Sequence, residues 1–197
     1  MNLIRDSAND LQITQAEGAS GPLYYTAHLR YYLDAQTIQA RDRGIVVDRR
    51  FELASTQVNQ AAVGDVISVT TTIIAPTNLY QMLVEVPIPA GTEPIDISLA
   101  TTSTQFDGPK FDAVENVGML QKPWRSWIPT ATDIRDEKVA LFTTYLPAGT
   151  YEYTFQVRAT MPGEYGVLPA YAEQMYFNEV WGRSASQVFT VAEGGRK

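Results

Sequence analysis

The segment that decides the fold of this chain is LPAGTYEYTFQVRA, residues 146–159. From Tyr151 to Ala159 every second residue is apolar or aromatic, and the residues between them are polar or charged. Successive side chains of a β-strand point to opposite faces, so this alternation predicts a strand with one buried face.

The Pro-Ala-Gly turn in front of this strand places a tyrosine at its start. In immunoglobulin-like sandwiches such a tyrosine forms a tyrosine corner, in which its hydroxyl bonds to backbone a few residues upstream. Tyr151 is the candidate, with Tyr153 as the alternate. Aromatic residues are also common in strands, so both could instead simply fill the core. Either interpretation keeps the sandwich.

Further strands are expected where the alternation or a β-branched run recurs, at 25–33, 67–73, 80–86, 139–146 and 187–191. No long window has the i, i+3, i+4, i+7 apolar spacing of an amphipathic helix, and only residues 130–137 are compatible with a short one. Seven or more strands with turns between them indicate an all-β antiparallel sandwich of the immunoglobulin or fibronectin type III kind.

We expect one sandwich domain over residues 22–197, preceded by a separate N-terminal arm at 1–21 that forms a linker strand leading into it. Between Pro87 and Pro129 the alternation fades while prolines, glycines and aromatics scatter, so a long insertion is expected at about 88–131. Loops longer than about 12–15 residues are usually functional or carry hidden structure, so partner contacts are expected there.

The composition excludes several classes of protein. With 45% hydrophobic and 19% charged residues the chain has a globular balance, and a net charge of −7 leaves no basic stripe for nucleic acid. The absence of cysteine rules out disulfides, thiolate catalysis and sulfur metal sites. No run approaches ~18 apolar residues, and the first residues lack the regions of a signal peptide, so this segment is not expected to insert in a membrane.

Catalytic and metal-binding chemistry has little support. His28 is the single histidine, so neither a Ser-His-Asp triad nor a multi-histidine metal site is easy to build around it. Asp133, Asp136 and Glu137 lie close together, but the neighbouring Arg135 and Lys138 favour a charged surface turn. We therefore expect no enzyme activity, no cofactor and no metal.

Aromatic and cationic residues are concentrated in two segments. Trp124, Arg125 and Trp127 lie in the expected insertion, and residue types of this kind are enriched at interface hot spots. Trp is also highly buried on average, so either tryptophan could instead plug an open end of the sandwich. Met175, Tyr176, Phe177 and Trp181 pose the same question, because alternation cannot bury all four on one face. The candidate contact residues are therefore Trp124, Arg125, Trp127, Met175, Tyr176 and Trp181.

The segment MPGEYGVLPAYAEQMYFNEVWGRSASQVFTV, residues 161–191, resembles the C-terminal end of bacterial alpha-2-macroglobulins. That family's terminal macroglobulin domain typically carries a run like LPA, then EeMYfPEvwGRS, before its last strand, and here Asn178 stands where proline is usual. Similar stretches occur at 44–51, 63–65 and 145–151, so the resemblance covers most of the chain from about Leu23.

The resemblance implies a non-catalytic C-terminal domain of a protease-trapping inhibitor, periplasmic or at the cell surface. Its partners would be other domains of the parent chain and, indirectly, target proteases, and the arm at 1–21 would be the linker strand from the preceding domain. In this family the terminal domain packs near a thioester-bearing domain and helps to shield it. The thioester needs a cysteine, so it cannot reside in this chain. The alternative is a freestanding adhesive or carbohydrate-binding sandwich that uses its tryptophans as stacking platforms.

Overall fold

The computed structural model describes residues 12–16, 18, 20–26, 34–96, 108–113 and 129–194. By compactness the chain divides into two units, Met1–Tyr32 and Leu33–Lys197. The described residues of the first unit are in neither strand nor helix. The strand expected at 25–33 reaches the described residues only at Tyr25 and Thr26, and His28 lies outside them. The N-terminal arm stays a prediction.

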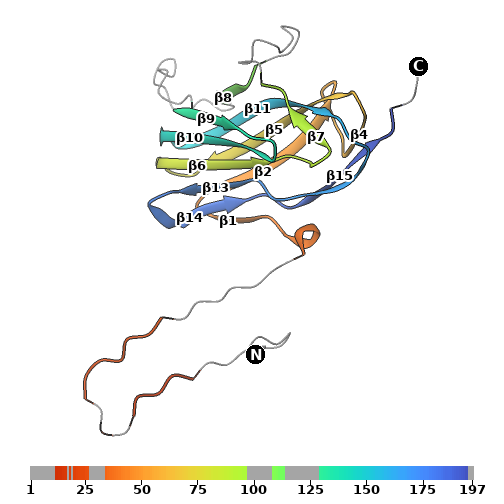
Figure 1. The fold of residues 1–197 in the computed structure, drawn as a ribbon. Coiled ribbons are helices and arrows are strands. Elements are labelled where there is room, and N and C mark those ends of the chain that lie inside the picture. Colours follow the sequence, from red (N-terminus) through yellow and green to blue (C-terminus); the bar gives the residue numbers. More distant parts are fainter. Residues whose placement is uncertain are drawn as a thin grey trace. The chain divides into compact units, whose positions relative to one another are not determined.

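The described residues of the second unit form fifteen strands and one 3-10 turn, η1 (Ala35–Thr37), which confirms the all-β class (Figure 1). Sheet A has the strand order β1 (Arg41–Arg43), β14 (Phe177–Arg183), β13 (Tyr171–Gln174), β6 (Leu79–Pro87), β10 (Lys138–Leu146), β9 (Ala131–Ile134). Sheet B has the order β3 (Thr56–Gln57), β2 (Val46–Leu53), β5 (Val66–Ala75), β11 (Gly149–Ala159), β7 (Thr92–Pro94), and β8 (Lys110–Ala113) also pairs with β11. Sheet C has the order β12 (Gly163–Val167), β15 (Gln187–Ala192), β4 (Gln60–Ala62).

Sheets A and B face each other across one core, and Figure 1 shows sheet A in front of sheet B. Every second residue of β11 from Tyr151 to Ala159 is buried, as the alternation predicted. These side chains meet buried residues of β6 and β10, among them Met82, Val84 and Val139. Sheet C closes one side, where the Phe51 and Phe189 rings lie 4.9 Å apart. Each fully buried side chain of this size stabilises the fold by about 1.5–3 kcal/mol.

Strand pairing is antiparallel throughout the described ladders except between β15 and β4, which run parallel. The expected strands at 67–73, 80–86, 139–146 and 187–191 correspond to β5, β6, β10 and β15. The helix considered near 130–137 is wrong. That segment forms β9 and a tight turn in which the Arg135 amide donates to the Lys138 carbonyl at 2.9 Å.

One prediction of alternation fails inside β6. In the strand expected at 80–86 the apolar residues Tyr80, Met82, Val84 and Val86 alternate, which predicts that Tyr80 is buried with Met82. In the structure Tyr80 is 54% exposed and Leu79 is buried instead. The cause is Gln81, whose φ of 51° lies in the left-handed region and breaks the two-residue period. Nothing in a glutamine identifies that conformation beforehand.

The segment expected as an insertion at about 88–131 contributes to sheet B in its described parts. Both β7 and β8 pair with β11, at Val157–Ala159 and at Tyr151–Thr154 respectively. The Phe111 ring of β8 stacks on Tyr151 at 5.6 Å between centroids. Residues 97–107 and 114–128 lie outside the described part of the chain.

Candidate interaction surface

The predicted contact residues fall into two groups. Trp124, Arg125 and Trp127 lie outside the described residues, so that part stays a prediction. The other three, Met175, Tyr176 and Trp181, belong to the hairpin formed by β13 and β14. A docking role for them stays a prediction too, but the structure gives their surroundings.

The β13–β14 hairpin presents two aromatic side chains to solvent. The Met175 amide donates to the Gln81 carbonyl at 2.9 Å, which ties the turn of the hairpin to β6. Met175 itself is half-buried, whereas Tyr176 is 76% and Phe177 59% exposed. The backbone of the turn is therefore held in place while its aromatic rings remain available to a partner.

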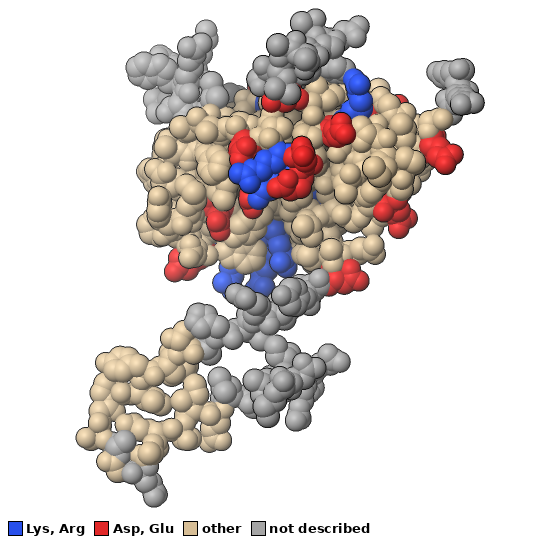
Figure 2. Space-filling view, in the orientation of Figure 1, with Lys and Arg blue, Asp and Glu red and all other residues tan. Residues whose placement is uncertain are grey.

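Two more tyrosines lie at this end of sheet A, where β6 and β14 begin and β10 and β13 end. Tyr80 pairs with Tyr145 in register, and their rings lie 5.1 Å apart. We call Tyr80, Tyr145, Tyr176 and Phe177 the aromatic end. Figure 2 shows the corresponding left end of the domain as mostly uncharged. Exposed apolar patches of this kind mark interaction sites more often than scattered single residues do.

Sequence reasoning missed Tyr80 and Tyr145. The alternation assigned Tyr80 to the core, and the left-handed conformation of Gln81 that exposes it has no sequence signature. Tyr145 stands at the end of a predicted strand, where its register against Tyr80 is decided by the pairing of β6 with β10. Only the fold brings these two rings together.

Trp181 has a different environment, on the outer face of sheet A. It is half-buried, its ring lies 6.0 Å from that of Tyr171, and the guanidinium carbons of Arg41 and Arg183 lie 6.0 and 5.9 Å from its centroid. Much of the ring is therefore occupied by neighbours within its own domain.

A groove of about 550 Å³ runs beside Tyr171. Its apolar lining includes Ile38, Pro87, Leu168 and Pro169, and the charged groups at its rim include the ion pair of Lys138 with Glu85. The Tyr171 hydroxyl donates to Glu173 at 2.8 Å. Burial raises the pKa of Tyr171 to about 12, and the Glu173 carboxylate acts in the same direction. The phenol is thus neutral over the physiological range and serves as a hydrogen-bond donor.

The motif residues at 168–170 and 182–184 support the fold. Ser184 donates its amide to the Ala170 carbonyl and accepts from the Ala170 amide through Oγ, both at 2.9 Å. At Gly182 a Cβ atom would lie 1.9 Å from the Ile45 carbonyl oxygen, so only glycine allows β14 to approach this close. These motif residues therefore hold β14 close to the segments that enter β2 and β13.

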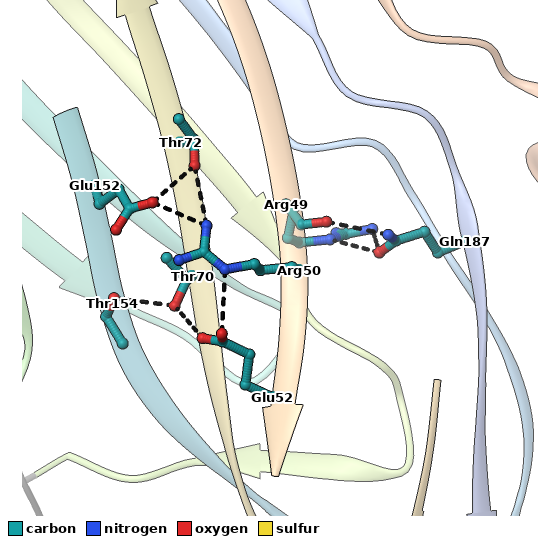
Figure 3. A network of polar contacts seen from close by, with 8 residues as sticks. All are labelled: Arg49, Arg50, Glu52, Thr70, Thr72, Glu152, Thr154 and Gln187. Carbon is teal, nitrogen blue, oxygen red and sulfur yellow. Dashed lines mark hydrogen bonds and ion pairs between the residues drawn. The ribbon is translucent and has the colours of Figure 1, made fainter. Parts of the chain in front are cut away.

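Arg49 is the largest of the most deeply buried side chains, 1% exposed. Its guanidinium donates to the carbonyls of Pro87 and Leu168, both at 2.8 Å, and to Gln187 Oε1 at 3.2 and 3.3 Å (Figure 3). Burial lowers its pKa to about 10, against a smaller opposing effect of Asp48. The hydrogen-bond acceptors of this buried charge are neutral, and they come from three separate segments of the chain.

The outer face of sheet B carries a self-contained polar network (Figure 3). Arg50 bridges Glu52 and Glu152 at 3.2 and 2.9 Å, and the hydroxyls of Thr70 and Thr72 donate to the same carboxylates. The hydrogen bond from Arg50 holds the pKa of Glu152 below its ordinary value. These groups already satisfy one another, so this face offers little to a partner compared with the aromatic end.

Of the carboxylates weighed for catalysis, Asp133 is half-buried in β9, whereas Asp136 and Glu137 are exposed in the β9–β10 turn. Asp133 pairs with Arg135 at 2.7 Å, in line with a charged surface turn. Among the described residues no three His, Cys, Asp or Glu side chains come together as metal ligands. The same residues include no helix long and apolar enough to cross a membrane.

Comparison with known protein families identifies the family to which this domain belongs. The family model described as the bacterial alpha-2-macroglobulin MG10 domain matches residues 44–179. The chain belongs to the bacterial alpha-2-macroglobulin MG10 family. The match begins just before β2 and ends within β14, so it includes most of sheets A and B and Met175 and Tyr176 of the hairpin.

Relatives of the MG10 domain here are much longer proteins. An alpha-2-macroglobulin homolog from Nostoc sp. is 24% identical over the whole of this chain, which spans 10% of that protein. Trypsin-activated alpha-2-macroglobulin from Escherichia coli aligns over 78% of this chain and 11% of its own, with a TM-score of 0.61 and 16% identity. A native Escherichia coli fragment from domain MG7 to the C-terminus has a TM-score of 0.61 and 17% identity over 78% of this chain and 24% of its own. The last two comparisons establish the shared fold.

Proposed function

We propose that this MG10 domain is a non-catalytic interaction module of a larger bacterial alpha-2-macroglobulin-like protease inhibitor. In this proposal it occupies the C-terminal end of the parent chain, in the periplasm or at the cell surface, and its partners are the parent's other domains. Target proteases are met only indirectly, by the whole inhibitor.

The aromatic end is the observation that supports this role best. Tyr176 and Phe177 project from a hairpin whose backbone is tied to β6, so a docking partner would order little of the domain on binding. Preorganised surfaces lose less conformational entropy on association. We propose that the aromatic end, with the Trp124–Trp127 segment, packs against the thioester-bearing domain and excludes water from the thioester until a protease cleaves the parent.

Hydrogen exchange tests the packing. Peptides covering 171–183 should exchange more slowly in the intact parent than in the isolated chain, because an interface removes their amides from water. Peptides of β5 in sheet B, covering 66–75, should exchange at the same rate in the parent and in the isolated chain. Equal exchange of the hairpin in the two samples would contradict an interface at the aromatic end.

Substitution then tests shielding. In the parent, Tyr176→Ser with Phe177→Ser should speed the release of free thiol before any protease is added, measured with a thiol-reactive dye. Ile74→Thr, which changes an exposed apolar residue on the outer face of sheet B, is the matched control and should leave the release rate unchanged. Identical release from the double variant and the control would remove the shielding role from this hairpin.

A further inference from the structure

Three arginines gather at the β1 edge of sheet A, around Trp181. The register pairs Arg41 directly with Arg183 and Arg43 with Trp181. Arg41 and Arg43 are exposed and Arg183 is half-buried. Because side chains alternate along a strand, Arg41 and Arg43 share one face of β1 and Asp42 points to the other. We call Arg41, Arg43 and Arg183 the arginine edge.

The positive charge of the arginine edge has no carboxylate partner within the described part of the chain. Glu173, which lies opposite Trp181 in register, already accepts the hydrogen bond of Tyr171. Arg183 Nε donates to the Gln39 carbonyl at 3.1 Å, which orients its guanidinium without neutralising it. Like charges directly opposite each other across two strands destabilise a sheet.

The Trp181 ring partly offsets this repulsion, because both guanidinium groups lie within about 6 Å of its centroid. A charged edge strand also protects a sheet from pairing with other chains. Any exposed charged residue on β1 would be enough to protect this edge from pairing with other chains. Such protection does not require Arg183 opposite Arg41, nor the Trp181 ring beside both.

We propose that the arginine edge binds a carboxylate-rich segment of another domain of the parent chain. Guanidinium forks match carboxylate oxygens in a bidentate geometry, and two forks on one face suit a pair of acidic side chains. The chain as a whole is acidic, with 22 Asp and Glu against 15 Lys and Arg. A local positive group on such a surface directs an acidic partner to this edge.

The surroundings agree with this occupant. Figure 2 shows Lys and Arg atoms at the lower border of the domain, where Figure 1 places β1 and β14. The charged cluster in the middle of the same view mixes both signs. The identification of the partner as a domain of the same parent rests on the proposed function. The binding of carboxylates by the arginine edge does not depend on that function and can be tested with this chain by itself.

The test is an NMR titration of the 197-residue chain at low salt. A peptide with blocked ends, Glu-Gly-Glu, should cause a saturable shift of the Trp181 indole N–H signal, assigned by its loss in Trp181→Phe. Lys-Gly-Lys should cause none. Arg41→Gln with Arg183→Gln should weaken the affinity for Glu-Gly-Glu at least tenfold.

Arg135→Gln is the matched control, because Arg135 is an exposed arginine in the β9–β10 turn, away from β1, and already pairs with Asp133. It should bind Glu-Gly-Glu like the unchanged chain. Equal affinity in both variants, or no shift at all, would overturn the proposal. Inorganic phosphate binding as tightly as the peptide would also overturn the assignment to carboxylates. Failure of the proposed function would instead appear in hydrogen exchange of the parent and leave this titration unaffected.

Discussion

At the scale of single residues, two tyrosines of β11 have similar burial and different bonding. The Tyr151 hydroxyl donates to the Pro147 carbonyl at 2.8 Å, which is the geometry of a tyrosine corner. The Tyr153 hydroxyl is buried and makes no hydrogen bond to the described residues, although Thr132 lies close enough to affect its pKa. The same substitution, Tyr→Phe, is therefore expected to change stability by different amounts at the two positions.

Tyr151→Phe should lower the free energy of unfolding by about 1 kcal/mol, since it leaves the Pro147 carbonyl without this donor. Tyr153→Phe should change it by less than about 0.5 kcal/mol, because the lost hydroxyl had no partner to leave behind. Urea unfolding of both variants measures the difference. A larger loss for Tyr153→Phe than for Tyr151→Phe would show that the Tyr153 hydroxyl is bonded after all.

The same tyrosine predicts a pH dependence. Burial raises the pKa of Tyr153 to about 12, whereas the unfolded chain ionises tyrosine near its ordinary value of about 10. A raised folded-state pKa gives stability that is fully present below about pH 10 and lost as pH rises toward about 12. Tyr153→Phe should flatten this alkaline loss relative to the unchanged chain. Arg49 acts in the opposite direction above pH 10, but it is present in both proteins and cancels in the comparison.

At the scale of elements, two strand glycines have very different surroundings. Gly182 in β14 leaves no room for a Cβ atom beside the Ile45 backbone, whereas a Cβ at Gly166 in β12 would meet only Gln36 Cγ at 3.9 Å. The first glycine decides how closely β14 can lie to the segment that enters β2. The second contributes only its own backbone.

Gly182→Ala should destabilise the domain by about 3 kcal/mol, the upper part of the range for overpacking, since backbone and not a flexible side chain must move. Gly166→Ala should cost less than about 0.5 kcal/mol. Thermal unfolding of the two variants checks this pair. Similar melting temperatures for both would mean that β14 can shift away from Ile45 at little cost.

At the scale of the whole molecule, adjacent arginines of β2 face opposite ways and do different work. Arg49 points inward, where it joins β2 to Gln187 of β15 and to backbone at Pro87 and Leu168. Arg50 points outward into the network with Glu52 and Glu152, where about 29% of its side chain is exposed. In the sequence the two residues are adjacent arginines, and their different roles become visible only in the structure.

Arg49→Met should therefore lower the free energy of unfolding by about 3–5 kcal/mol, since several buried acceptors lose their donor at once. Arg50→Met is the matched control and should cost about 1 kcal/mol, in the range of partly exposed ion pairs. Chemical denaturation of both proteins measures the contrast. Equal losses would mean that the buried acceptors find water or another donor when Arg49 is removed.

Much of the fold could be predicted from the sequence because strand alternation is a local property. The two-residue period of 151–159 follows from the geometry of an extended chain, and the structure confirms it along β11. The β-branched run that became β5 follows from the same local preference. The resemblance at 161–191 led to the family through residues such as Gly182 and Ser184, which the fold requires.

Tertiary structure alone decided which residues meet. The aromatic end exists because Gln81 breaks the period of β6 and because the register of β6 with β10 aligns Tyr80 with Tyr145. The arginine edge exists because β1 pairs with β14, strands more than 130 residues apart, in a register that opposes Arg41 and Arg183. Local sequence determines whether a segment is a strand, but the neighbours of each side chain depend on long-range pairing, and that is settled by packing of the whole core.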